Sequence, residues 1–547
     1  MVSFFKQNGQ KKKSQKEIQD TEKPTENEKQ EYLCSSISAN LEYLKQKTGN
    51  SADISSRTLS ISQDPLIKVV IVYVQGLIDN PTVTDFLIES IMNHPELHVK
   101  LSADEALDMI SDDVVSLDGV TTVQDWKSLF LSLLSGQTII FIDGISKALA
   151  ANTQGGEKRG IQEPSTHLAV RGSKEGFTES NETNIAMVRR IINSPDLWVE
   201  SMKIGTVTNT DVSIMYLNGI AEDKVVKEVR KRLKDIRIDS ILESGYIEQL
   251  IEDQAMTPFP TIINTERPDM VAGNLLEGRV AILVNGTPFV LLVPALFIQF
   301  FQSVEDYYNR FDIGSATRFL RIVVFLISLV GPALYIGATT FNQEMIPTQL
   351  LIAIAAQRET VPFPAFIEAL IMEIAFEILR EAGLRMPKAI GSTISIVGAL
   401  VIGQAAVQAG VVSPAMVIIV SITAIASFAT PSYSIAISAR LLRFGFMLSA
   451  AVLGIYGIIL ALFLLIVHLC SLRSFGVPYM SPLAPFIPSE VGDSILRKPF
   501  WAMDKRPKSV SDSQNLTREG KSQKPQPPQS RGMKMARKNK GDNNEPS

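Results

Sequence analysis

Apolar residues are concentrated between residues 280 and 472, and within this part the stretch 391–431 contains no Asp, Glu, Lys or Arg. At about 1.5 Å per residue, each half of the stretch is long enough to cross a hydrocarbon core of about 30 Å. Gly410, Ser413 and Pro414 mark a turn between the two halves. The pattern therefore predicts a helical hairpin inside a membrane.

By the same criterion of apolar length, residues 322–472 are predicted to form a bundle of membrane-spanning helices. A further helix, 365–382, is amphipathic, because carboxylates follow one side and isoleucines the other. This pattern predicts a helix that lies at the membrane surface or re-enters beside a water-filled cavity. The predicted membrane-spanning helices are about 322–341, 391–411, 414–433 and 446–470.

Ahead of this bundle the pattern changes to short β-branched runs followed by turns and helices. The runs 66–76 and 137–143 predict two buried strands, and with their helices they indicate an α/β subdomain over 60–160. Residues 161–255 predict a second α/β subdomain, in which helices alternate with strands at 201–207 and 211–217. The predicted fold is a multi-pass α-helical membrane protein with an N-terminal cytosolic α/β head made of two subdomains.

The remaining segments are expected to connect these parts or to lack order. Residues 1–59 predict a polar disordered tail with a short helix near 32–44. Residues 256–321 predict a Pro-rich linker, a β-hairpin at 279–293 and a juxtamembrane helix. A membrane span at 280–304 is the alternative, but the Asn-Gly turn at its centre favours the hairpin. Residues 473–547 predict a Pro-rich connector and a basic tail, disordered after about residue 505.

Charge and cysteine usage narrow the class of protein and its topology. The formal net charge is −4, yet residues 496–547 alone carry thirteen basic and five acidic residues, which argues against a nucleic-acid-binding body. Cys34 and Cys470 stand far apart, so they indicate neither a disulfide framework nor a zinc site. The N-terminus has no signal-peptide pattern, and the C-terminal tail is basic. We therefore expect both termini, and the head, in the cytosol.

Two glutamines inside the predicted hairpin are candidates for a functional site. On an ideal helix their row adjoins a row of small residues that would let a neighbouring helix approach closely. An oligomer would then repeat the amides around a shared lumen, where neutral dipoles partly replace the hydration shell of an ion. The alternative is that the amides bond neighbouring helices within one subunit. The candidates for the lumen are Ser392, Leu400, Gln404 and Gln408, and those for helix packing are Ser395, Ala399 and Gly403.

Two groups of charged residues are further candidates. Glu373, Glu377 and Glu381 follow one side of the amphipathic helix, where they would attract cations to a pore mouth. A solvated face, partly neutralised by nearby arginines, is the alternative. A glycine-flanked loop at 172–176 would capture an anion or contact another subunit, or would form an exposed turn. Its charged candidates are Arg171, Lys174 and Glu175.

Four motifs, in order along roughly residues 60–500, resemble one known family. LVIGQAAVQAGVVSP…ASFATPSYSIAISARLLRF (Leu400 to Phe444), TPFPTIINTERPD (Thr257 to Asp269), GRVAILVNGTPFVLLVP (Gly278 to Pro294) and VRGSKEGFTE…TNIAMVRR (Val170 to Arg190) are present. They closely resemble the A-subunit of bacterial spore nutrient germinant receptors, the GerA-type family.

The resemblance implies a multi-pass protein of the spore inner membrane that contacts membrane lipids. It implies assembly with an integral-membrane subunit similar to an amino-acid transporter and with a lipoprotein subunit. It also suggests that A-subunits form a homo-oligomer that acts as a ligand-gated cation channel. The signal would be a small nutrient such as an amino acid or a sugar, bound here or by the partner subunit.

Other function classes have weaker support in the sequence. There is no P-loop lysine motif, no GxSxG and no Cys–His pair, so we expect neither an enzyme nor a bound cofactor or metal. A secondary transporter would need inverted repeats, and the sequence shows no repeat. A non-conducting scaffold that recruits other subunits through its head is the second alternative.

Overall fold

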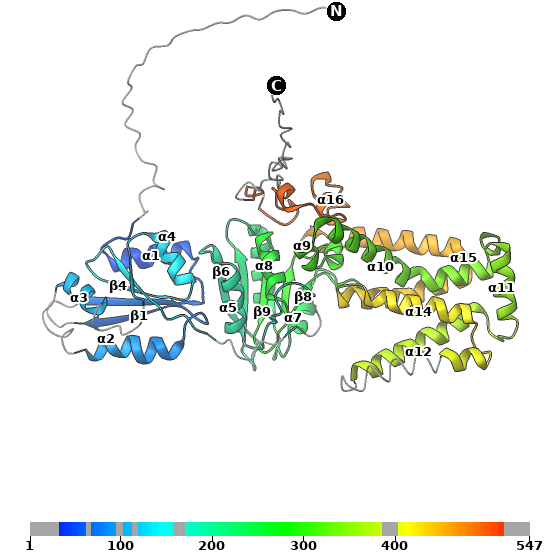
Figure 1. Cartoon of the computed structure of the whole chain (residues 1–547), viewed down its shortest axis with the longest axis horizontal. Helices are drawn as coiled ribbons and strands as arrows, with labels where there is room; N and C mark the ends of the chain where they lie inside the picture. Colours follow the sequence, from blue (N-terminus) through cyan, green and yellow to red (C-terminus); the bar gives the residue numbers. More distant parts are fainter. Residues whose placement is uncertain are drawn as a thin grey trace, which may run out of the picture. The chain divides into compact units, whose positions relative to one another are not determined.

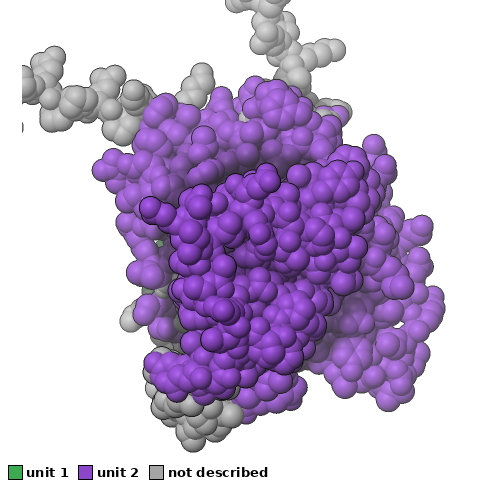
Figure 2. All heavy atoms as spheres, turned by 90° about the vertical axis from the view of Figure 1, so that its right-hand side faces the viewer, with its two compact units in different colours: residues 1–44, 55–74, 78–154 green, residues 45–54, 75–77, 155–547 purple. Residues whose placement is uncertain are grey.

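The computed structural model describes residues 32–61, 67–94, 102–111, 119–156, 163–164, 170–385, 403–512 and 514–518 (Figure 1). The chain divides into two compact units, which are described separately. The first comprises residues 1–44, 55–74 and 78–154, and the second comprises residues 45–54, 75–77 and 155–547. Figure 2 views the second unit from the end that carries its long helices.

The first unit is built on a five-stranded sheet of order β1-β2-β4-β5-β3, in which β2 pairs with β4, β4 with β5 and β5 with β3, all antiparallel. Helices cover both faces of the sheet (Figure 1). The elements are α1 (Ile37–Lys47), β1 (Ile54–Ile61), β2 (Ile67–Val74), a π-helical segment (Thr82–Ile88), α2 (Glu89–Asn93), α3 (Ala103–Met109), β3 (Thr121–Val123), α4 (Trp126–Leu134), β4 (Thr138–Ile142) and β5 (Ala148–Ala151).

The second unit begins with a sheet of order β6-β7-β9-β10-β8. The predicted hairpin is confirmed as β9 and β10, which pair antiparallel with Leu291 opposite Ile282. The elements are α5 (Asn181–Ile191), β6 (Leu197–Ile204), β7 (Thr210–Leu217), α6 (Asp223–Asp235), α7 (Ser244–Ile251), β8 (Ile263–Thr265), α8 (Pro268–Leu276), β9 (Val280–Val284) and β10 (Val290–Val293).

The two sheets have the same topology. In each, a helix precedes two adjacent strands, further helices lead to an edge strand, and one helix leads from that strand to the last two strands. Numbered from its own first strand, each sheet therefore has the order 1-2-4-5-3. The head is a structural repeat, which the sequence did not reveal because the two copies share topology and not a visible motif.

Beyond β10 the chain forms a helical bundle. Among the described residues, α10 and α15 are long and apolar enough to cross a membrane, and the 15-residue α14 is shorter than a full span. Most of the predicted span 391–411 lies outside the described residues. The elements are 3₁₀ segments at Phe297–Phe301 and Gln343–Met345, α9 (Glu305–Tyr308), α10 (Phe311–Thr340), α11 (Thr348–Arg358), α12 (Ala365–Arg385), a helical segment at 403–408, α14 (Pro414–Phe428) and α15 (Tyr433–Ser471).

Helix α15 is interrupted at Gly454, which has the non-helical angles φ 61° and ψ −144°. The Asn342 side chain accepts a hydrogen bond from the next N–H, that of Ile455, at 3.3 Å. Ser438 and His468, on opposite sides of the break, contact the adjacent linker residues Pro258 and Thr257. The two parts, 433–453 and 455–471, therefore fold back on each other. The predicted single span 446–470 is thus corrected to two helices, about 31 and 25 Å long.

After α15 the structure describes residues 472–512 and 514–518. It contains β11 (Arg473–Ser474), β12 (Val477–Pro478) and α16 (Pro488–Ser494). A β-bridge joins Ser511 to Ala221 in the head. This differs from the predicted disorder after residue 505, because backbone hydrogen bonds to the head hold the segment. We call residues 473–518 the C-terminal segment.

One apolar core joins the second sheet to the bundle. Buried side chains on one face of the sheet, including Leu283 and Leu292, belong to the same cluster as Phe325 of α10 and Met447 of α15. The other face packs with α6 and α7, and Phe475 of the C-terminal segment enters that second cluster. Hydrophobic burial therefore holds the second repeat against α10 and α15.

Candidate functional site

The two predicted glutamines border a hollow in the bundle. Gln404 and Gln408 are exposed on the helical segment 403–408. A cavity of about 700 Å³ beside them is also lined by Met372 and Phe376 of α12 and by residues of α14, including Ser421. Exposed amides in so apolar a region require water or another polar partner.

One of the three predicted helix-packing positions lies among the described residues. Gly403 is buried, and a Cβ at this position would lie 3.6 Å from the Val417 side chain of α14, an ordinary contact distance. The site would therefore admit a Cβ, and the helix-packing role of Gly403 stays a prediction. Ser392, Ser395, Ala399 and Leu400 lie outside the described residues.

The predicted carboxylate row is paired with arginines. Glu373 is buried against Arg443 at 2.6 Å, and Arg443 also donates to the Ser328 carbonyl oxygen at 2.7 Å. Glu377 lies 3.0 Å from Arg380 and 3.2 Å from Arg440. The main effect of such a buried ion pair is that neither of its two charges is left in the interior without a partner.

The third carboxylate of the row, Glu381, forms an exposed pair with Arg385 at 2.7 Å. The group as a whole therefore contains three carboxylates and four guanidinium groups. It carries no negative excess in this conformation, and cation attraction by it stays a prediction.

The orientation of α12 reverses what its pattern suggested. We expected the charged side of the helix to face water. Instead the side with Glu373 faces α15, while Ile371, Ile374 and Ile378 are exposed, Ile378 by 64%. Ion pairing inside the bundle satisfies the charges, so the apolar side is left to meet lipid or another protein surface.

A buried carboxylate that the sequence reasoning missed lies at the start of α12. The Glu368 side chain accepts hydrogen bonds from the backbone N–H of Ser413 at 3.0 Å, from its hydroxyl at 2.8 Å, and from Arg358 at 3.3 Å. Ser413 in turn caps the first turn of α14. Glu368 thus fixes the turn that carries Gln408, and its signal was an isolated charge in an otherwise apolar stretch.

The loop predicted to capture an anion or contact a subunit is held through its backbone. A Cβ at Gly172, where φ is +129°, would lie 2.5 Å from the Tyr308 ring, so glycine is required there. Arg267 donates to the Ser173 carbonyl oxygen at 3.0 Å and pairs with Asp269 at 2.7 Å. Asp269 also accepts from the Tyr308 hydroxyl at 2.7 Å.

The charged side chains of this loop lie at the surface of the described part of the chain. Arg171, Lys174 and Glu175 are exposed, and Lys174 forms only a solvent-exposed pair with Glu163 at 3.2 Å. Such pairs contribute little free energy. Both proposed roles of the loop stay predictions.

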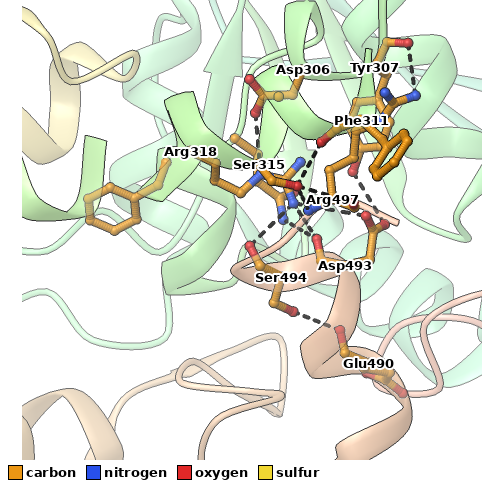
Figure 3. A network of polar contacts seen from close by, with 12 residues as sticks. Asp306, Tyr307, Phe311, Ser315, Arg318, Glu490, Asp493, Ser494 and Arg497 are labelled. Carbon is orange, nitrogen blue, oxygen red and sulfur yellow. Dashed lines mark hydrogen bonds and ion pairs between the residues drawn. The ribbon is translucent and has the colours of Figure 1, made fainter. Parts of the chain in front are cut away.

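The base of α10 forms a buried polar network with the C-terminal segment (Figure 3). Arg318 is 0% exposed and lies 3.3 Å from Asp306, which Arg321 also contacts at 2.8 Å. Arg318 donates further to the carbonyl oxygens of Asp493 and Ser494. These arginines therefore join α10 to the segment that precedes it and to the C-terminal segment.

The second half of this network, also drawn in Figure 3, surrounds Tyr307. Arg497 donates to the carbonyl oxygens of Asn309 at 2.7 Å and Tyr307 at 3.2 Å. The Tyr307 hydroxyl donates to Asp493 at 3.4 Å. Burial raises the pKa of Asp493 to about 6, and the charge of Glu277 adds to this effect, while Arg318 opposes it.

An α/β head with two like repeats, joined through buried arginines to an apolar helical bundle, defines a class of membrane-associated protein with a large polar domain. The family model described as the Bacillus/Clostridium GerA spore germination protein matches residues 42–509. The chain belongs to this family, which confirms the resemblance inferred from the four motifs.

Individual relatives agree with this assignment. "Spore germination protein KA" of Bacillus subtilis (strain 168) is 57% identical over 95% of this chain and 94% of its own length. "Spore germination protein GerLA" of Bacillus cereus is 38% identical over 87% and 96%.

A solved structure also matches. "Crystal structure of the N-terminal domain of the A subunit of the Bacillus megaterium spore germinant receptor GerK3" is 52% identical, with a TM-score of 0.39, over 49% of this chain and 98% of that chain.

Proposed function

We propose that this chain is the A-type subunit of a spore germinant receptor and that its oligomer forms a nutrient-gated cation channel in the spore inner membrane. The receptor would also contain the transporter-like integral-membrane subunit and the lipoprotein subunit that the family resemblance implies. The nutrient, an amino acid or a sugar, would bind the complex, and the A-type subunit itself would catalyse no reaction. Family membership supports the germination role.

The observation that carries the channel proposal is the exposure of Gln404 and Gln408 beside a hollow of about 700 Å³. All charges on the inward side of α12 are paired within the subunit, so these amides are the polar groups left for a lumen or for a neighbouring subunit. An oligomer would bring the amides together as a ring. Nutrient binding would open the ring if it favours the open state, since a ligand shifts an equilibrium only by its differential affinity.

The test is cation efflux from liposomes that contain the purified protein with its partner subunits, with and without candidate nutrients. Gln404→Leu is expected to change nutrient-dependent efflux at least severalfold while leaving insertion and oligomeric state intact. The matched control is Gln357→Leu, the same chemical change at an exposed position of α11.

Efflux that is equal in wild type and Gln404→Leu would remove the lumen assignment. No efflux from inserted, oligomeric protein under any combination would overturn the channel proposal and favour a scaffold that acts through the head.

A further inference from the structure

A second cavity, of about 310 Å³, lies where the head, the base of the bundle and the C-terminal segment meet. Its walls come from the end of α8 and the start of β9, from residues 296–307, and from residues 482–518. Six basic and four acidic side chains line the cavity, which leaves a net positive charge of two. The basic residues are Arg279, Lys498, Lys505, Arg506, Lys508 and Arg518.

Arg279 is the buried centre of this lining, with only 3% of its surface exposed. One of its terminal nitrogens donates to Asn274 at 2.9 Å and to Glu277 at 2.6 Å. Its Nε atom has no acceptor among the residues that the structure describes. A buried guanidinium N–H normally has an acceptor, because leaving it unpaired costs free energy.

Two further guanidinium nitrogens near the cavity share this property. Nη2 of Arg318 and Nε of Arg497, both from buried side chains, have no acceptor within the described part of the chain. Arg318 lies 3.9 Å from Asp493, and Arg497 donates to the carbonyl oxygen of Tyr307; both Asp493 and Tyr307 line the cavity. The Oδ1 atom of Asp493 is likewise buried without a hydrogen bond, so the described residues of this region hold three unsatisfied guanidinium donors and one unsatisfied carboxylate oxygen.

The acidic side chains of the lining are largely engaged by the protein. Glu277 pairs with Arg279 and, at 3.7 Å, with Arg518. Glu490 accepts from the backbone N–H of Lys508 at 2.7 Å. Lys505 and Lys508 form no ion pair with a described residue, and their side chains are exposed. The unmatched charge of the cavity is therefore positive.

We propose that this cavity binds a multiply charged oxyanion of the phosphate type. Arginine forks and lysine ammonium groups together are well suited to phosphate oxygens, and a dianion matches the net charge of the lining. The volume also admits the organic group that carries the phosphate. The bound anion would join the second repeat to the C-terminal segment and hold the base of α10 in place.

Two sources present this chemistry: a soluble phosphate compound and the headgroup of an anionic phospholipid. The phospholipid headgroup is supported as the source by exposed aromatic residues near the cavity. Phe311 at the start of α10 and Phe500 and Trp501 beside the cavity expose 41–55% of their surface, as aromatic residues at a membrane surface do. The two sources are distinguished by the experiment and not by the cavity itself.

The test is titration calorimetry of the full chain in detergent with inorganic phosphate at constant ionic strength, with chloride as the reference anion. We expect saturable phosphate binding that is about tenfold weaker in the Lys505→Gln/Lys508→Gln variant, because two charge-assisted contacts are lost. The matched control, Lys224→Gln/Lys227→Gln, removes two exposed lysines of α6 and should bind as wild type does. Both pairs are exposed, so neither change should unfold the protein.

A second measurement repeats the titration in nanodiscs. Phosphate binding that disappears in discs containing cardiolipin, whose headgroup carries two phosphate charges, and persists in phosphatidylcholine discs would assign the site to a lipid headgroup. Persistence in both would assign it to a soluble phosphate compound. Equal responses to phosphate and chloride, or equal affinities in the variant and its control, would overturn the proposal.

Discussion

The two repeats of the head have one topology and different surroundings. The first has its own core, in which Ile71 and Leu149 pack with the helices around its sheet. The second shares its core with the bundle, where Leu283 and Phe325 belong to one cluster. It also receives the C-terminal segment, whose Phe475 ring lies 4.4 Å from the Arg232 guanidinium group of α6.

This difference shows that topology alone does not set a role in the protein. Each repeat ends at its last strand and continues into the next module, and buried charges reinforce the connection of the second repeat to the chain that follows it. Arg318 and Arg497 tie the chain after β10 to the C-terminal segment, and Arg321 shares the carboxylate of Asp306 with Arg318. We therefore regard the second repeat and the bundle as one cooperative body, and the first repeat as a separately folding domain.

The largest expected effect comes from breaking the buried charge network. Arg318→Met leaves Asp306, which is also fully buried, without one of its two arginines, and should destabilise the second unit by about 3–5 kcal/mol. The measurement is denaturant unfolding followed by proteolysis of the second unit. The control Arg310→Met breaks an exposed pair and should change stability by less than about 1 kcal/mol. Equal effects of the two variants would contradict a structural role for the network.

A pair of core substitutions sharpens the comparison between the repeats. Leu283→Ala and Ile71→Ala each remove a fully buried side chain and should each cost about 2–5 kcal/mol. We expect Leu283→Ala to lower protease protection of α10 and α15, because its cavity opens in their shared core. Ile71→Ala should lower protection in the first repeat alone. A loss of protection in α10 from Ile71→Ala would show that the repeats are not separate.

The second repeat should also respond to pH through Glu248 on α7. Burial raises the pKa of this carboxyl from its ordinary 4.5 to about 7, so the folded state retains a proton that the unfolded state has lost. Below pH 4.5 the carboxyl is protonated in both states, so the free energy of unfolding is at its full value. As pH rises from 4.5 through 7 the unfolded state loses its proton first, and this stability is lost.

The free energy of unfolding of the wild type should therefore fall by an amount on the order of 2–3 kcal/mol between pH 5 and pH 8. Glu248→Gln should abolish this fall. Thermal unfolding at the two pH values measures this difference. The exposed Glu175→Gln is the control and should retain the wild-type pH dependence. An unchanged pH dependence in Glu248→Gln would place the titrating group elsewhere.

The smallest expected effect concerns the linker that joins the second repeat to α15. Ser438 is buried and donates to the Pro258 carbonyl oxygen, so Ser438→Ala should cost about 0.5–1.5 kcal/mol. Ser449→Ala, at a partly exposed position of the same helix, should be near neutral. Unfolding midpoints in detergent compare the two, and a larger effect at Ser449 would contradict the linker contact.

The sequence predicted those features that local patterns determine. The strands 66–76 and 137–143, the Asn-Gly hairpin and the apolar α10 follow from periodicity and turn chemistry within a few residues. The strand β1 was missed because it lies mostly in the part predicted as a disordered tail, and the short strands β3, β5 and β8 were missed since three or four residues carry too little pattern. Their absence from the prediction also concealed the repeat.

The candidate sites were predictable only in part, because partners distant in sequence decide the environment of a charge. The spacing of Glu373 and Glu377 correctly placed them on one side of a helix. It did not reveal that Arg443 and Arg440, more than sixty residues later, would turn that side inward. The Arg318 network and the break at Gly454 likewise depend on tertiary contacts.

Native-state hydrogen exchange of the full chain in detergent, at increasing denaturant, tests most directly whether the second repeat and the bundle unfold as one body. In that case we expect amides of β7 and β9 to open together with those of α10, with one free energy and one denaturant dependence. Amides of β2 and β4 should open separately. Common opening of β9 with β4, at a free energy different from that of α10, would contradict this expectation.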